Sequence, residues 1–156
     1  MDVELNSRTT AVGLARFAKE YLEAAIVVDR EMGKEKAYPR ISPMPAYFLL
    51  THGIELTLKA YLRHTGMFVK ELQKVGHDLQ SLHTTACELG LQDLHKLSAS
   101  DAEAFSLLAA ANEFHQLRYI QTGFKRFPEW SQAEHLAVRL HQAIAPKVGY
   151  KSFSLA

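Results

Sequence analysis

The sequence predicts an all-α fold, an up-and-down bundle of four to five helices, and three observations lead to this prediction. Apolar residues recur at helical spacing through several long segments. Capping residues, glycines and prolines separate these segments, and no segment competes as a strand. The chain has 156 residues, of which 47% are hydrophobic. This length and composition are typical of one domain with one core, so we expect residues 1–156 to form a single helical domain.

The central helix is expected between Ala46 and Gly66, where the sequence is apolar on almost every side. Its charged stripe consists of His52, Glu55, Lys59 and Arg63. At about 100° per residue they fall within a window of roughly 80°. So apolar a helix is expected in the middle of a bundle, contacted from several sides. Its narrow charged stripe then requires a polar partner, a cleft or water.

The first helix is expected to start after Ser7, Thr9 or Thr10, each of which can act as an N-cap. Its apolar stripe continues to about residue 30. Gly33 is the expected left-handed stop. Residues 1–6 are expected to fray.

Three further helices are expected after the central one. Asp78 can cap a helix over residues 79–89 through the backbone N–H of one of the two residues beyond Leu79. Capping boxes, SDAE and SQAE, predict helices over about residues 100–119 and 131–148. The tail, residues 150–156, is expected either to dock or to fray.

The overall composition narrows the classes of function. The formal net charge is +1, which does not indicate a strongly basic nucleic-acid surface. With Cys87 as the single cysteine no internal disulfide can form, which favours a reducing compartment. No apolar run is long enough to span a bilayer, and the acidic, polar N-terminus is unlike a signal peptide. We therefore expect a cytoplasmic protein without membrane contact.

Three short motifs resemble the HEPN superfamily: HGIELTLKAYL on the central helix, GHDLxxL after it, and LRY at the end of the fourth helix. These are small all-α domains of prokaryotic toxin–antitoxin and phage-defence systems and of related housekeeping proteins. The resemblance covers roughly residues 14–140. It implies a helical bundle that dimerises and, in catalytic members, metal-independent ribonuclease action by an Arg followed by a His after a gap of four to six residues.

The sequence departs from this catalytic pattern. Arg118 matches the position of the arginine, but Gly123, Phe124 and Lys125 occupy the places where the His should be. Tyr119 replaces the polar residue that often follows the arginine. The resemblance therefore supports the fold more strongly than it supports the nuclease activity.

The first candidate site is formed by His52, Glu55 and Lys59. In a functional interpretation, Glu55 shares a cleft with Arg118 and Lys59 lies at the rim. In a structural interpretation, Glu55 and Lys59 are a helical i, i+4 pair that contributes about 0.2–0.5 kcal/mol. A third interpretation is a buried ion pair between Glu55 and Arg118 that fixes the register of two helices.

The second and third candidate sites lie in later segments. His77 and Asp78 are either a general base with its orienting acid, or a capping Asp78 beside a histidine that bonds nearby backbone. Arg118 and Tyr119, followed by basic and aromatic residues, are either a surface for RNA bases and phosphates, or a loop or dimer contact pinned by aromatic packing.

Three hypotheses of function follow. The first is a non-catalytic, homodimeric HEPN-like module that binds RNA, a nucleotide or a partner protein. The second is a ribonuclease with an altered active site built on Arg118, His77 or His115. The third is a purely structural interaction protein. We expect no cofactor and no metal, since the sequence has no HExxH motif and no Glu-x-x-His pair of the di-iron type.

Overall fold

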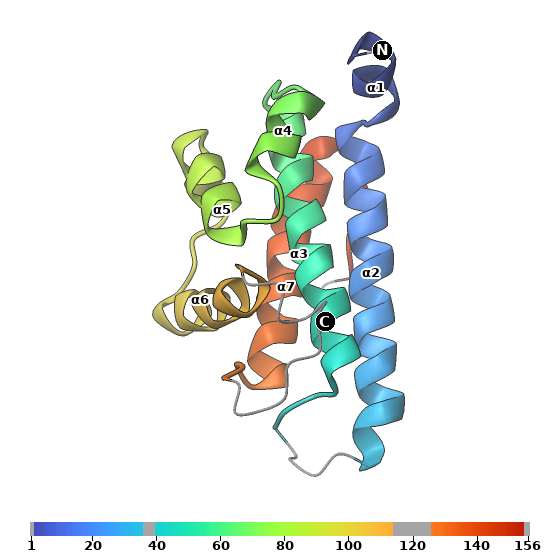
Figure 1. Ribbon diagram of the computed structural model, residues 1–156, viewed down its shortest axis with the longest axis vertical. Helices are drawn as coiled ribbons and strands as arrows, with labels where there is room; N and C mark the ends of the chain where they lie inside the picture. Colours follow the sequence, from blue (N-terminus) through green and yellow to red (C-terminus); the bar gives the residue numbers. More distant parts are fainter. Residues whose placement is uncertain (1, 36–39, 114–125, 155–156) are drawn as a thin grey trace.

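The computed structural model describes residues 2–35, 40–113 and 126–154. All regular structure in these three ranges is helical and they contain no strand, which confirms the predicted all-α class (Figure 1). The helices are α1 (Asp2–Arg8), α2 (Ala11–Met32), α3 (Met44–His64), α4 (Val69–Val75), α5 (Leu79–Glu88), α6 (Ala99–Glu113) and α7 (Trp130–Val148). Short 3-10 turns cover Gly33–Glu35 and Leu91–Asp93. The short helices α1 and α4 come in addition to the expected five.

The predicted central helix is α3, and its central position is confirmed. It packs against α2, α4, α5, α6 and α7, and more than half of its residues are buried. The long helices α2 and α7 lie alongside it (Figure 1). The starts of α3 and α7 meet, because the rings of Tyr47 and Trp130 pack edge to face at 5.3 Å. These two helices therefore run parallel, and α6 crosses them, so the arrangement departs from a simple up-and-down order.

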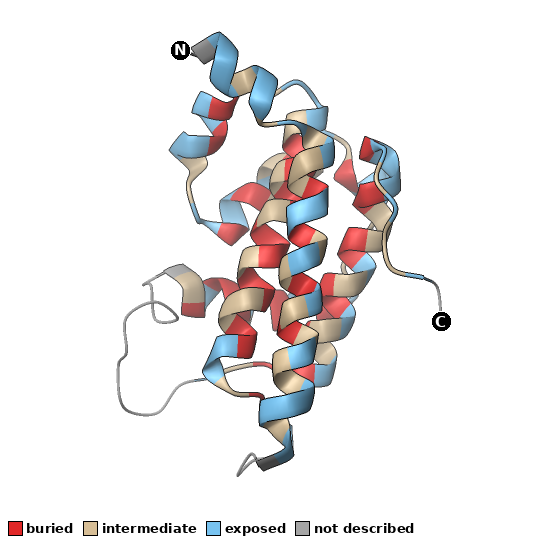
Figure 2. Cartoon of the chain, turned by 90° about the vertical axis from the view of Figure 1, so that its right-hand side faces the viewer, coloured by how far each residue is buried: buried red, intermediate tan, exposed pale blue. Residues whose placement is uncertain are grey.

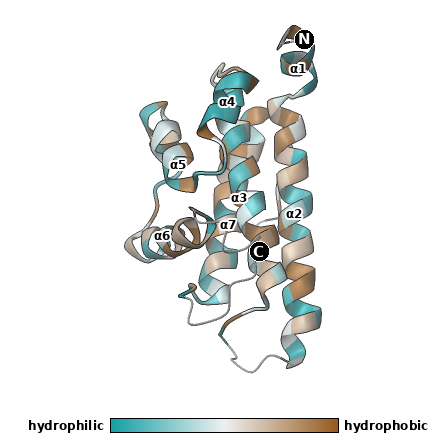
Figure 3. Ribbon diagram, viewed as in Figure 1, coloured by the Kyte–Doolittle hydropathy of each residue, from teal (hydrophilic) through white to brown (hydrophobic). Residues whose placement is uncertain are grey.

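Small residues bring α2 close to α3. The buried face of α2 consists of Ala15, Ala18, Leu22 and Ala25. Opposite it, a Cβ added to Gly53 would lie 2.5 Å from a terminal carbon of Leu22. An alanine at position 53 would therefore force the Leu22 side chain or α2 itself to shift. Figure 2 shows the buried residues on the inner faces of the long helices, and Figure 3 shows hydrophilic residues interrupting every helix. None of the described helices combines the length and hydrophobicity needed to cross a membrane.

Arg63, the last charged residue of the α3 stripe, holds the N-terminal segments in place. Its guanidinium donates to the carbonyl oxygens of Asn6 at 2.8 Å, Thr9 at 2.9 Å and Met67 at 3.1 Å. These carbonyls belong to the end of α1, to the connection from α1 to α2 and to the connection from α3 to α4. The polar partner that the stripe requires at this end is therefore the backbone, and Arg63 is structural.

Two predicted boundaries are confirmed and one is wrong. Thr10 is the N-cap of α2 and accepts a hydrogen bond from the Gly13 N–H at 3.0 Å. Asp78 is the N-cap of α5. Gly33 has φ −68° and continues the chain into a 3-10 turn, so it is not a left-handed stop. The Gly33 N–H donates to the Asp29 carbonyl inside α2, so the helical hydrogen-bond pattern continues to this residue.

The two predicted capping boxes do not cap. Helix α6 begins earlier than expected, and the Ser98 hydroxyl accepts from the Asp101 N–H at 3.1 Å. Helix α7 begins at Trp130 without a side-chain cap. Its first N–H donates instead to the Arg40 carbonyl at 2.8 Å, a partner from a distant segment. A tertiary contact therefore replaces the local cap, and the sequence pattern cannot reveal such a contact.

Candidate functional site

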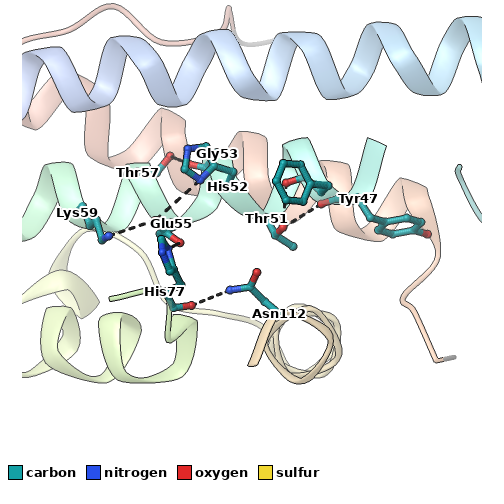
Figure 4. A network of polar contacts seen from close by, with 10 residues as sticks. Tyr47, Thr51, His52, Gly53, Glu55, Thr57, Lys59, His77 and Asn112 are labelled. Carbon is teal, nitrogen blue, oxygen red and sulfur yellow. Dashed lines mark hydrogen bonds and ion pairs between the residues drawn. The ribbon is translucent and has the colours of Figure 1, made fainter. Parts of the chain in front are cut away.

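A buried carboxylate on the central helix is the focus of the candidate site. The side chain of Glu55 is only 4% exposed. Its Oε1 lies 2.8 Å from Nδ1 of His77, and its Oε2 accepts from Nζ of Lys59 at 3.2 Å (Figure 4). Nδ1 of His52 lies 3.9 Å from Oε2. Two predicted candidates, the α3 stripe and His77, therefore form one cluster.

The cluster compensates the charge of the buried carboxylate. An unpaired carboxylate would be strongly disfavoured in the core. Lys59 supplies a positive charge one helical turn away, as the structural interpretation predicts for an i, i+4 pair. The ring of His52 packs edge to face against Tyr21 of α2, with centroids 4.4 Å apart. Glu55 is therefore satisfied from its own helix and from His77.

Backbone geometry between α4 and α5 places His77 against Glu55. Gly76 ends α4 with φ +67°, a conformation that L side chains rarely adopt. The chain turns there, and the next residue, His77, reaches α3. The side-chain amide of Asn112, at the end of α6, donates to the His77 carbonyl at 2.7 Å (Figure 4). Three elements thus fix the position of one imidazole.

Asp78 is a helix cap and does not orient His77. Its carboxylate accepts from the N–H of Ser81 at 3.0 Å and from the Ser81 hydroxyl at 2.8 Å. The first of these bonds, reinforced by the second, lowers the pKa of Asp78. Of the two interpretations of His77 and Asp78, the contacts agree with capping by Asp78 and not with an Asp78 that orients the His77 ring. The acid that contacts His77 is Glu55. The capping interpretation also expected the His77 ring to bond nearby backbone, and the ring bonds Glu55 instead.

The hydrogen bond to Glu55 defines what His77 can do chemically. An ionised carboxylate only accepts, so Nδ1 of His77 carries the proton and donates. In the neutral ring Nε2 is then the basic nitrogen. The side chain of His77 is 44% exposed, and Nε2 has no hydrogen-bond partner in the described ranges. A carboxylate-oriented imidazole with an open Nε2 is the arrangement of a general base or of a hydrogen-bonding group for a ligand.

A groove beside His77 gives a ligand room to approach. It has a volume of about 320 Å³ and lies between the start of α5 and α6. The residues that line it are Asp78, Gln80, Ser106, Ala109 and Ala110. A larger groove of about 420 Å³ follows α7, and none of the described residues that line it is a predicted site residue. We place the candidate site at the smaller groove, because its lining includes Asp78, the residue that follows His77 in the chain, and residues of α6, the helix whose Asn112 binds the His77 carbonyl.

Several predicted site residues lie outside the described ranges. They are His115, Arg118 and Tyr119, which fall within residues 114–125. The expected contact between Glu55 and Arg118, and the predicted RNA surface around Tyr119, therefore stay predictions. Within the described ranges, no group of three or more His, Cys, Asp or Glu side chains could hold a metal ion.

Sequence reasoning missed two residues of the site. Asn112 and Tyr21 hold His77 and His52 from helices distant in the sequence. Asn112 is a polar residue near the end of an otherwise mainly apolar helix, and this could have marked it in the sequence as a candidate for a polar contact. Tyr21 lies within an apolar stripe and gave no signal.

No family model, curated protein or solved structure matches this chain. The class established is therefore an all-α protein with a histidine–glutamate cluster. The resemblance to the HEPN superfamily rests on the three sequence motifs.

Proposed function

We propose that this chain is a HEPN-like helical binding module that recognises RNA or a nucleotide through the surface around His77, without cleaving it. One observation carries the proposal: the contact between Glu55 and His77. Glu55 and His77 are each a polar position of one of the motifs on which the resemblance depends, HGIELTLKAYL and GHDLxxL. The two motifs therefore meet at one point, beside a groove.

The chemistry of this surface fits a nucleotide. Nε2 of His77 can accept from a ribose hydroxyl or a base N–H and, when protonated, can donate to a phosphate oxygen. The side chains of Gln80 and Ser106 line the groove and supply both donors and acceptors. Lys59 is mostly buried and paired with Glu55, so few cations are available for phosphates. We therefore expect moderate affinity with a shallow salt dependence.

A binding experiment with His77→Ala tests this proposal. Fluorescence anisotropy with a labelled single-stranded RNA should show about tenfold weaker binding, the loss of one hydrogen bond to a charged group. His135→Ala is the matched control, since His135 is an exposed histidine on α7, and it should bind as the wild type does. Equal affinity of the His77→Ala variant and the wild type, or no binding by the wild type, contradicts the proposal.

A second candidate function is a metal-independent ribonuclease with an altered site. The orientation of His77 by Glu55 favours it, because such an imidazole can deprotonate the ribose 2′-OH. A cation is needed for the phosphate, and Arg118 is proposed for this role. The expected result is cleavage of RNA in EDTA that is lost in both His77→Ala and Arg118→Ala. Cleavage that survives both substitutions excludes this function for the site, and cleavage that requires them overturns the non-catalytic proposal.

The homodimer and a protein partner belong to the same proposal. Light scattering coupled to size-exclusion chromatography measures the mass directly, against 17.6 kDa for one chain. A dimer supports the HEPN-like proposal, and a monomer at all concentrations contradicts it.

A purely structural interaction protein, the third hypothesis, predicts capture of a partner protein that His77→Ala leaves unchanged. A setting in toxin–antitoxin or phage defence is part of the proposal and depends on the family resemblance alone.

A further inference from the structure

The groove between the start of α5 and α6 presents a carboxylate to a ligand. The described residues that line it are Asp78, Gln80, Ser106, Ala109 and Ala110. None of these five is a lysine or an arginine, so none of them can neutralise a phosphate. The Asp78 carboxylate would repel a phosphate, because both groups are negatively charged at neutral pH. Of the parts of a nucleotide, the groove therefore suits the base, which can donate hydrogen bonds to a carboxylate.

Asp78 retains acceptor sites after it caps α5. Its Oδ1 accepts from the Ser81 N–H at 3.0 Å, and its Oδ2 accepts from the Ser81 hydroxyl at 2.8 Å. An ionised carboxylate has about four acceptor sites, two on each oxygen. These two bonds therefore leave one site on each oxygen, and they hold the carboxylate in one orientation.

Two adjacent acceptors distinguish between the bases of RNA. Guanine has two adjacent donors, N1–H and the N2 amino group, on its Watson–Crick edge, and proteins read this edge in unstacked bases. Adenine, cytosine and uracil each have an acceptor beside the donor on this edge. One oxygen of the carboxylate would then face a lone pair and gain no hydrogen bond. A carboxylate with one open site on each oxygen therefore favours guanine.

The other residues of the groove are compatible with a flat ring. The Gln80 amide donates to the Ser106 hydroxyl at 3.3 Å. The Ser106 hydroxyl can therefore donate its own proton to a base carbonyl such as O6 of guanine. Ala109 and Ala110 contribute methyl groups, on which a ring can lie without the loss of a hydrogen bond. The volume of about 320 Å³ is at the lower end of the range for small-molecule sites, about 300–1,000 Å³, as a single base requires.

We propose that this groove binds one unpaired guanine base, with the Asp78 carboxylate accepting from N1–H and from the N2 amino group. This inference rests on the proposed function, and it names the base that the module selects. Asp78 then has two roles, because one carboxylate caps α5 and reads the base.

Three labelled RNAs that differ at one position test the inference by fluorescence anisotropy. They are a short uridine RNA and its derivatives with one guanosine or one inosine, whose base lacks only the N2 amino group of guanine. The wild type should bind the guanosine RNA about tenfold more tightly than the uridine RNA, and the inosine RNA should bind with intermediate affinity. Asp78→Asn should lose most of this preference, since the amide presents a donor where guanine needs an acceptor. Asparagine caps a helix about as well as aspartate, so α5 should remain intact.

Glu88→Gln is the matched control, because Glu88 is an exposed carboxylate on the same helix, and it should keep the full preference for guanosine. Equal binding of the guanosine and inosine RNAs by the wild type overturns the inference, and this comparison needs no variant. A preference that Asp78→Asn leaves unchanged overturns it too. The proposed function is tested separately, since His77→Ala should weaken the binding of all three RNAs by a similar factor. If the wild type binds none of them, both proposals fail.

Discussion

Replacement of Glu55 by Gln should destabilise the protein by about 2–3 kcal/mol at neutral pH. The substitution keeps the shape and removes the charge that Lys59 and His77 contact. A fully buried pair that loses one partner costs roughly 3–5 kcal/mol. The expected value is lower here, because the side chains of Lys59 and His77 are 14% and 44% exposed and can regain water. The corresponding decrease in Tm is about 4–12 °C for a chain of this size.

Urea unfolding followed by far-UV circular dichroism measures this change. The matched control is Glu20→Gln, which removes an i, i+4 partner of Arg16 on the exposed side of α2 and should cost no more than about 0.5 kcal/mol. A double-mutant cycle with Lys59→Met should give a coupling energy of about 0.5–3 kcal/mol. A loss in Glu55→Gln no greater than in the control would refute the reasoning that the carboxylate is buried and satisfied by this cluster.

Three other substitutions test the packing, the cap and a buried hydroxyl. Gly53→Ala should cost about 1–3 kcal/mol in urea unfolding, because the added Cβ lies 2.5 Å from Leu22; unchanged stability would show that α2 can move away freely. Asp78→Ala should cost about 1 kcal/mol at neutral pH. Since the Ser81 N–H and hydroxyl lower the Asp78 pKa, this cost should be complete above about pH 4 and disappear as the pH falls through the lowered pKa. Urea unfolding curves recorded at neutral pH and at a pH below that lowered pKa check this. Burial raises the pKa of Tyr47 to about 12, so in an ultraviolet pH titration Tyr47→Phe should remove a tyrosine transition at about pH 12.

Composition and periodicity could predict α3 and its environment. An apolar helix with one narrow charged stripe has to be central, and the stripe has to find polar partners. Both expectations hold, since α3 contacts helices on several sides and Glu55 is buried among polar groups. The local signal for Asp78 was sufficient too, because a cap needs only the next three residues.

Contacts between distant segments could not be predicted in the same way. The sequence places His77 next to Asp78, which leaves open whether they act as a pair or whether Asp78 only caps the helix. The turn at Gly76 directs the ring of His77 to Glu55 instead. Similarly, the N–H of Trp130 donates to the Arg40 carbonyl, so α7 starts without the serine cap that its sequence offers. In both cases tertiary structure selects the partner.

The difference in exposure across the cluster bears on whether it is only structural. An ion pair that serves only to fix two helices gains most when both partners are shielded from water. Here the carboxylate of Glu55 is almost fully buried, whereas the side chain of His77 is nearly half exposed. The buried member therefore fixes the tautomer of the exposed member, and Nε2 has no hydrogen-bond partner in the described ranges. Stability alone does not require an oriented and accessible nitrogen, whereas recognition of a ligand or proton transfer does, which is why the functional proposals place His77 at the point of contact.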